Sequence, residues 1–281
     1  MTVSICVIGA LRATFEAEAA FEGESRPAGI GVLLAVAMAR LGAEVRFLAG
    51  CQENVCTPSA RAPLVAEGID VHPFRLGEPV PAEEGSESGE SGEGLADLTT
   101  AFRDLPATDL LLLQLEVPDE PLEQALLAAR EESRRVVLHA LPARALEGDS
   151  LSTVELLIAT TDDAITLARQ EGEKVSRKGL ARRLSALGPA RITLTSIDGR
   201  ALSFDGETFH ESKSEPGEGA PTGLTAQFLF SAALSVAVAK GHNAERALRF
   251  ATAAVGLPVS GSGDFPGLPS ARDLESIDEA G

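Results

Sequence analysis

Short blocks of apolar and polar positions alternate along the first quarter of the chain. An apolar strand is predicted over Val3–Gly9, and a helix is predicted over Gly31–Leu41, where Leu34 and Met38 fall on one face. The next predicted elements are a strand over Glu44–Leu48, a helix over Arg61–Glu67 and a strand that starts at Ile69. Strands that alternate with helices are typical of βαβ units.

The same alternation resumes near residue 109 and continues almost to the C-terminus. The predicted strands are Asp109–Gln114, Arg135–His139, Val154–Ile158 and Ala190–Thr195, and the predicted helices are Pro121–Arg130, Asp163–Gln170, Thr225–Lys240 and Ala244–Val255. A hairpin of Arg200–Phe204 and Glu207–His210 turns at Asp205-Gly206, the strongest turn signal in the chain. The pattern predicts an α/β fold with a mostly parallel central sheet, helices on both faces and one domain over residues 1–281.

One stretch, at about 77–97, departs from this pattern. Acidic residues recur through it without any Lys or Arg, and Gly and Ser fill most of the part between Gly85 and Gly94. Such a composition predicts a flexible, self-repelling acidic loop. An acidic segment that binds a partner protein is the alternative interpretation.

The net charge of the whole chain disfavours some classes of binding partner. Lys and Arg total 24 against 42 Asp and Glu, so the formal net charge is −18. Such a surface repels nucleic-acid phosphates and anionic lipid headgroups, so we expect neither a nucleic-acid nor a membrane partner. The chain has eleven Phe but no Trp and no Tyr, which leaves few aromatic platforms for stacking.

Cysteine usage and the apolar segments predict a location. The three cysteines show no zinc-like spacing, and Cys6 falls inside an apolar strand, which fits a reducing compartment. The start of the sequence lacks the charged region of a signal peptide. The longest apolar stretch, Phe228–Ala239, is too short to span a bilayer. We therefore expect a cytoplasmic protein.

Three segments, in this order, resemble the ribokinase family of carbohydrate kinases. They are Ala37-Met-Ala-Arg-Leu-Gly-Ala-Glu-Val45 with Ala66–Val71, then Leu111-Leu-Leu-Gln-Leu-Glu-Val-Pro118 with Val136–Arg144, then Thr222-Gly223 with Ala239–Gly241, Ala247–Ala254 and Gly267-Leu-Pro269. The resemblance covers nearly the whole chain. It implies the ribokinase-like three-layer fold and transfer of the γ-phosphoryl group of ATP to a sugar hydroxyl, with ATP and Mg²⁺ as cofactors.

The stretch Ala220-Pro-Thr-Gly-Leu-Thr-Ala226 matches the family's Asp-Thr-Thr-Gly-Ala-Gly-Asp motif. That motif opens a helix, and its small residues let backbone N–H groups approach the transferred phosphate, while its last aspartate is the base. Thr222 and Gly223 are retained here, whereas Leu224 and Thr225 bring side chains into the anion cradle. Ala226 stands at the base position and has no proton acceptor, so the resemblance predicts a degraded catalytic motif.

The sugar-side positions are altered as well. The family's early aspartate aligns with Thr14, and its Gly-Gly-Lys-Gly-Ala-Asn segment aligns with Ala28-Gly-Ile-Gly-Val-Leu33. Gly29 and Gly31 are therefore retained, while Leu33 replaces an amide. Glu116 is retained in the Gln-Leu-Glu context where ribokinases contact the sugar, so it is either a pocket residue or a structural carboxylate.

The positions that align with the family's nucleotide-binding and metal-binding elements are also altered. The family's Asn-x-x-Glu element aligns with Thr160-Thr-Asp-Asp163, in which Asp163 keeps a carboxylate, and a nucleotide-loop glycine aligns with Thr195. The family's Gly-x-Asp element aligns with Gln52-Glu-Asn54. No metal ligand is certain from this pattern.

Three further features outside these motifs are considered as parts of a functional site. His139 at a strand end is expected to be structural, and Asp264 is a remote candidate for a substitute base. Gly29-x-Gly31 is not a dinucleotide fingerprint, because residue 34 is Leu and no strand immediately precedes it.

The acidic stretch falls where ribokinases carry the lid strands that also build their dimer. We therefore expect a reduced lid and a doubtful homodimer. The favoured hypothesis is a weakly active or inactive kinase homologue that serves as a scaffold or ligand sensor, with a sugar or nucleotide as possible ligand. The alternative is an active sugar or nucleoside kinase with an unusual base.

Overall fold

The apolar strands assemble into one sheet in the computed structural model, which describes residues 2–14, 26–52, 55–76, 97–103, 106–146, 148–169, 175–258, 265 and 267–269. Most of the acidic stretch, together with Glu53, Asn54 and Asp264, lies outside these residues. The strands are β1 (Ser4–Ala10), β4 (Glu44–Cys51), β5 (Asp70–Arg75), β6 (Leu110–Gln114), β7 (Val136–His139), β8 (Leu156–Thr160), β9 (Arg191–Thr195), β10 (Arg200–Phe204) and β11 (Phe209–Lys213).

The nine strands follow the order β11-β10-β9-β8-β7-β6-β1-β4-β5. All pairs from β9 to β5 are parallel, whereas β10 is antiparallel to both β9 and β11. The first strand of the chain therefore lies between β4 and β6, and Ile5 pairs with both Val45 and Leu110. Asp205-Gly206 turns the β10–β11 hairpin, as the sequence predicts.

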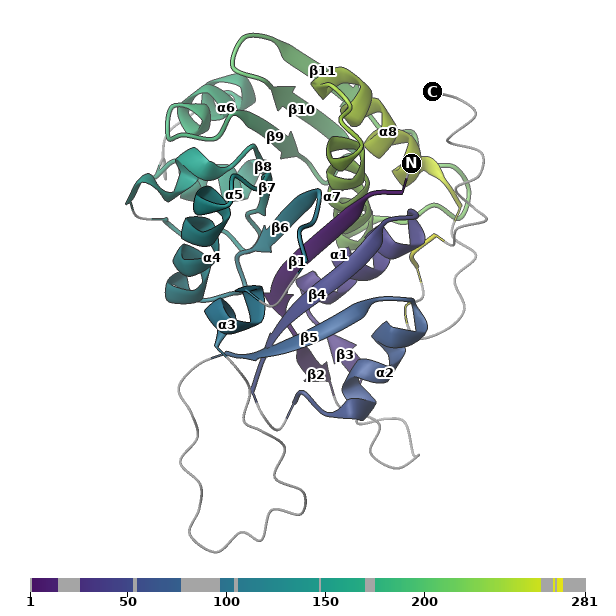
Figure 1. Ribbon diagram of the computed structural model, residues 1–281. Coiled ribbons are helices and arrows are strands. Elements are labelled where there is room, and N and C mark those ends of the chain that lie inside the picture. The colour runs from purple at the N-terminus through teal and green to yellow at the C-terminus, as the bar shows by residue number, and fades with distance from the viewer. Residues whose placement is uncertain are drawn as a thin grey trace, which may run out of the picture.

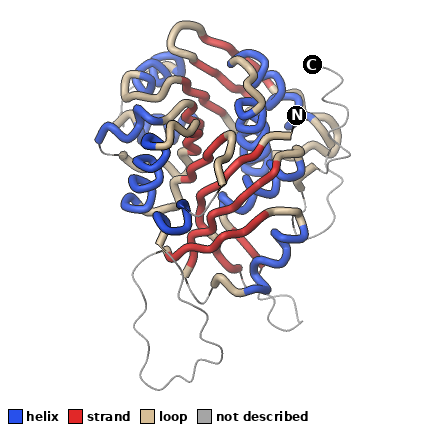
Figure 2. The backbone as a smooth tube through the Cα atoms, in the orientation of Figure 1, coloured by secondary structure: helices blue, strands red, loops and turns tan. Residues whose placement is uncertain are grey.

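Helices cover both faces of the sheet (Figures 1 and 2). One face carries α1 (Ile30–Arg40), α7 (Gly223–Ala239) and α8 (Ala244–Gly256), and the other carries α3 (Leu98–Arg103), α4 (Asp119–Glu131), α5 (Thr161–Leu167) and α6 (Arg177–Ser185). The helix α2 (Pro58–Ala66) packs beside β5. This arrangement confirms the predicted α/β fold with a mostly parallel sheet and helices on both faces.

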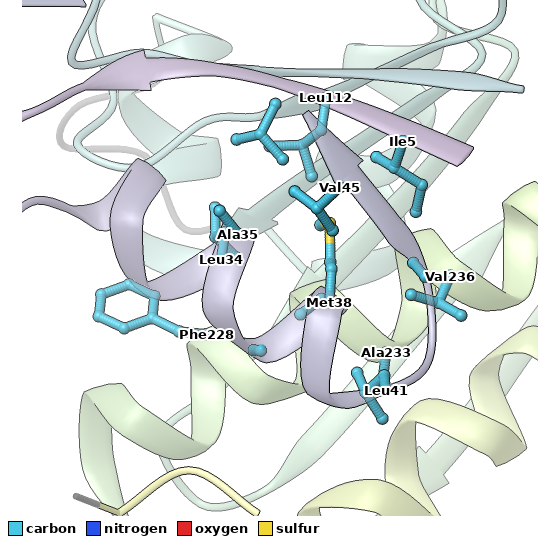
Figure 3. Close-up of a cluster of buried hydrophobic side chains, with 14 of the residues drawn as sticks. Ile5, Leu34, Ala35, Met38, Leu41, Val45, Leu112, Phe228, Ala233 and Val236 are labelled. Atoms are coloured by element: carbon cyan, nitrogen blue, oxygen red, sulfur yellow. The ribbon is translucent and has the colours of Figure 1, made fainter. Parts of the chain in front are cut away.

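Two buried cores result, one on each face of the sheet. In the first, Leu34 and Met38 of α1 pack between the sheet and Val236 of α7, and all three are fully buried (Figure 3). The helix α7 is apolar on nearly all sides because α1, the sheet and α8 surround it. No helix in the described part of the chain is long and apolar enough to cross a membrane.

Five short elements were not predicted from the sequence. They are the two-stranded antiparallel sheet of β2 (Arg12–Thr14) and β3 (Arg26–Ala28), the helices α3 and α6, and the 3-10 helix η1 (Gly148–Thr153). Each is too short for a clear apolar period, and α6 is rich in Lys and Arg. The helix α3 begins after Asp97, whose side chain accepts a hydrogen bond from the backbone N–H of Thr100.

The cysteines also differ from expectation. Cys51 at the end of β4 and Cys56 before α2 form a disulfide with a Cα–Cα distance of 5.9 Å, a pairing that the sequence did not predict. Cys6 is free and buried, as expected.

Candidate functional site

The N-terminus of α7 keeps the backbone of an anion cradle. Thr222 is the N-cap but accepts no hydrogen bond with its side chain, and Gly223 follows with a positive φ of 59°. The first backbone bond of the helix, from Ala226 N to Thr222 O, is long at 3.5 Å. The N–H groups of the first turn therefore have no side-chain cap, and a residue with a Cβ would be strained at position 223.

The side chains of this first turn are all neutral. Leu224 is 59% exposed, so its side chain points largely to solvent. The methyl group of Thr225 lies toward Gly267, and Ala226 is partly buried against the core. No group at these positions can accept a proton from a substrate hydroxyl.

A pocket opens beside this turn. The loop after β9, from Thr195 to Gly199, forms one wall, and Ala226, Gln227 and Phe230 of α7 form another. Val255 of α8 contributes to its apolar part. This arrangement brings three predicted positions, Thr195, Gly223 and Ala226, to one cavity.

Glu116 lies just after the end of β6, at the N-terminus of α1. Its Oε2 accepts a hydrogen bond of 2.8 Å from Ile30 N, the first residue of α1, and its Oε1 lies 3.5 Å from Nη2 of Arg12. The side chain of Glu116 is 10% exposed, whereas that of Arg12 is 65% exposed. Because an acidic group is favourable at a helix N-terminus, Glu116 stabilises α1.

The glycines that precede and begin α1 are required by close contacts. Gly29 has a φ of 126°, and a Cβ there would lie 2.6 Å from Ala10 O. A Cβ on Gly31 would lie 3.0 Å from the Cα of Gly9, so β1 and α1 meet without side chains. Leu33 is partly buried against the core. Thr14 lies at the end of β2, paired with Arg26 in register.

The side chain of Asp163 is held by hydrogen bonds from Thr160 and from the loop after β7. Its Oδ1 accepts a hydrogen bond of 3.1 Å from Ala143 N, and its Oδ2 accepts one from the hydroxyl of Thr160. Thr160 in turn caps α5 by accepting from Asp163 N at 3.0 Å. The two residues form a reciprocal cap at the start of α5.

His139, Gln114 and Thr195 belong to a row of buried polar residues at the carboxyl edge of the sheet. Gln114 donates to Leu141 O and accepts from Glu116 N, while Thr195 donates to Ala159 O at 3.4 Å. His139 packs its ring edge-on to Phe228 at 6.3 Å between centroids, and burial lowers its pKa to about 4. His139 is therefore neutral at pH 7.

Arg144 is a supporting residue that the sequence reasoning missed. Its guanidinium donates to Leu115 O at 2.8 Å and to Val117 O at 3.0 Å, and it pairs with Asp119. These bonds hold both neighbours of Glu116. Gln227, whose amide oxygen is buried in the pocket wall, was also missed, and its place directly after Ala226 was the available signal.

The predicted site residues therefore fall into separate groups. Thr195, Gly223 and Ala226 share the pocket. Glu116 lies at the start of α1, and Asp163 lies at the start of α5. Among the described residues, no three His, Cys, Asp or Glu side chains lie close enough to hold a metal ion.

Known proteins share the length and the fold of this chain. The ribokinase of Bacillus subtilis is 27% identical over 270 residues, which cover 89% of this chain and 87% of that protein. The ribokinase of Haemophilus influenzae is 24% identical over 277 residues, with coverage of 90% and 87%. No protein-family model matches the sequence.

A solved structure of ribokinase from Thermotoga maritima matches with a TM-score of 0.70 at 21% identity, over 99% of both chains. The Arabidopsis thaliana ribokinase complexed with ribose and ATP matches with a TM-score of 0.68 at 19% identity, over 99% of both chains. The fold is thus that of the ribokinase-like carbohydrate kinases. The chain is also similar in sequence to ribokinases over nearly its whole length.

Proposed function

We propose that this chain is a ribokinase-type kinase homologue in which phosphoryl transfer is weak or absent, and that the fold serves to bind a small ligand. The observation that carries the proposal is Ala226 in the first turn of α7, where the family's motif places its base. A positioned base contributes roughly 10²- to 10⁴-fold to the rate of such reactions. The methyl group of Ala226 supplies none of this.

The retained carboxylates offer no replacement. Both oxygens of Asp163 accept hydrogen bonds from the protein, and Glu116 holds Ile30 N and the Arg12 guanidinium. Moving either carboxylate to a substrate would leave buried backbone N–H groups unpaired, which costs about 1–3 kcal/mol each. Both residues support the fold of the site rather than its chemistry.

Magnesium, which the resemblance implies, does not fit the described residues. Mg²⁺ requires oxygen ligands in near-octahedral geometry. Asp163 is the one carboxylate at the aligned element that matches the family, and each of its oxygens already accepts a hydrogen bond from the protein. ATP with Mg²⁺ is a cofactor pair of this chain only if the family's activity is retained.

A reduced lid belongs to the same proposal. The sheet of β2 and β3 supplies two short strands beside α2, and the acidic sequence stands where the family carries further lid strands. Incomplete covering of a sugar would leave the reaction open to water, which disfavours transfer. It would also weaken a homodimer built from lid strands.

The test is ATP consumption against a panel of sugars and nucleosides. We expect the natural chain to match a control preparation that lacks the protein. The Ala226→Asp variant restores the missing base, and Ala226→Asn is its matched control of the same size without basicity. Turnover by the natural chain well above the control would overturn the proposal and favour an active kinase with an unusual base.

A further inference from the structure

We propose that the edge strand β11 is a self-association surface, on which the β11 strands of two copies of this chain pair antiparallel about Ser212 and join their sheets. The inference goes beyond the proposed function and does not depend on it. The surface lies at the opposite edge of the sheet from β5, where the acidic stretch begins.

The two edges of the sheet differ in how open they are. The strand β5 forms one edge and β11 forms the other (Figure 1). The β5 edge contains Pro73, which has no N–H group to donate, and α2 packs beside it. The strand β11 contains no proline. It is therefore the better template for a further strand.

The bonds of the β10–β11 hairpin define which backbone groups of β11 face outward. Ser214 N donates to Gly199 O at 2.9 Å, and Asp205 N donates to Thr208 O at 3.3 Å. In an antiparallel pair, alternate residues of a strand bond the same neighbour. The even-numbered residues of β11 therefore bond β10.

Phe209, Glu211 and Lys213 consequently direct their N–H and C=O groups away from β10. Within the described residues, no helix or loop bonds these groups. The side chains of Glu211 and Lys213 are exposed as well. The outer side of β11 thus presents a row of backbone donors and acceptors that an antiparallel strand would bond.

Side-chain contacts hold β11 in place on both faces. Nζ of Lys178, on α6, lies 2.7 Å from Oε1 of Glu211. On the other face, Oγ of Ser212 lies 2.8 Å from Oγ1 of Thr252, on α8. A strand that is already fixed loses little conformational freedom when it pairs, which favours association.

The charges of β11 select one register. Pairing about Ser212 sets Glu211 of each copy opposite Lys213 of the other, which gives two cross-strand pairs of opposite charge. Pairing about Glu211 would instead set this carboxylate against its own copy. A lysine on an edge strand ordinarily opposes pairing, but Glu211 supplies the matching charge two positions away.

The same register continues the charge complementarity beyond β11. It sets the exposed Glu215 of one copy opposite Phe209 of the other. The ring of Phe209 lies 5.4 Å from Nζ of Lys178 and 5.0 Å from Cζ of Arg182. The acid of one copy therefore approaches two cations of the other, which is favourable.

The size of this contact predicts a weak dimer. An interface limited to one pair of strands and their flanking side chains falls in the class below about 1,200 Å², which is typical of weak and transient complexes. We therefore expect an equilibrium between monomer and dimer that depends on protein concentration and weakens as salt is added.

The experiment is analytical ultracentrifugation of the full chain over a concentration series. Glu211→Lys and Lys213→Glu should each weaken the dimer about tenfold or more, because each variant places two like-charge pairs across the interface. An equimolar mixture of the two variants should dimerise again. In the mixed dimer, the introduced lysine faces the introduced glutamate, and the native Lys213 faces the native Glu211.

Glu123→Lys and Arg130→Glu are the matched controls. They change the net charge by the same amounts at exposed positions of α4, away from β11 (Figure 1). Each should leave the dimer of the natural chain unchanged, and thermal melting checks that all four variants fold.

Three results would overturn the inference. They are a natural chain that stays monomeric at the highest concentration it tolerates, a dimer that persists in Lys213→Glu, and a mixture of the two folded variants that stays monomeric. None of them bears on the turnover assay, because neither variant changes a residue of the pocket or of α7.

Discussion

The Oε2 atom of Glu116 lies 2.8 Å from the backbone nitrogen of Ile30, although 86 positions separate the two residues along the chain. The carboxylate that the family resemblance assigns to a sugar site thus closes the N-terminus of α1. Its other oxygen faces Arg12 on β2. Glu116 joins the end of β6, the first turn of α1 and the small β2–β3 sheet.

Replacing Glu116 should therefore change stability. Glu116→Ala leaves Ile30 N–H without its partner, and we expect a loss of about 1–3 kcal/mol in the free energy of unfolding. Glu116→Gln keeps a hydrogen-bond acceptor, so it should lower the free energy of unfolding by less. Urea denaturation measures both, with the exposed Glu245→Ala as control. An unchanged midpoint for Glu116→Ala would show that the carboxylate is free for a ligand.

Replacing Arg144 should destabilise the fold about as much as replacing Glu116, although the Arg144 side chain contacts no predicted site residue directly. Arg144→Met removes donors from Leu115 O and Val117 O, so we expect a loss of about 2 kcal/mol. Arg249→Met is the matched control, because Arg249 is 68% exposed in a single ion pair with Glu245 and should cost at most about 0.5 kcal/mol. Equal urea midpoints for the two variants would contradict this role for Arg144.

His139 should make stability depend on pH. Burial lowers its pKa from 6.5 to about 4, so the unfolded chain takes up this proton first as the pH falls. The native state loses stability between pH 6.5 and 4, in total roughly 3 kcal/mol from this group, and gains nothing further above pH 6.5. Unfolding free energies of the natural chain and His139→Asn, compared across this range, isolate the effect. Parallel curves would contradict it.

Thiol counting tests the cysteine arrangement. Burial raises the pKa of Cys6 to about 12, and Cys51 is paired with Cys56, so native protein should show no reactive thiol. Unfolding without reductant should expose one thiol, and reduction should expose all three cysteines of the chain. Three reactive thiols in unfolded, unreduced protein would exclude the disulfide.

Much of the fold follows from the local sequence pattern. The strand β6 is a continuous apolar run, and α1 places Leu34 and Met38 on its buried face, so both were predicted within a residue or two. The strands β2 and β3 were not, because their pairing between Arg12 and Ala28 depends on partners rather than on an apolar period.

The contacts of the candidate site residues are harder to predict from the sequence than the strands and helices. Position 226 can be read from one motif, and the structure does bring it beside Thr195. The hydrogen bonds of Glu116 and Asp163 depend on the backbone N–H groups of Ile30 and Ala143, which any residue except proline could supply. Contacts to backbone atoms leave no signature in a single sequence.

The position of α7 bears on how the chain folds and on how it can evolve. The apolar face of α1 remains uncovered until residues near Val236 have been made, since these late residues complete its core. Folding therefore demands the body of α7 whether or not the protein performs chemistry. Selection for folding preserves the apolar residues from Phe228 onward, whereas the side chains of Leu224 to Ala226 in the first turn can change when catalysis is no longer selected.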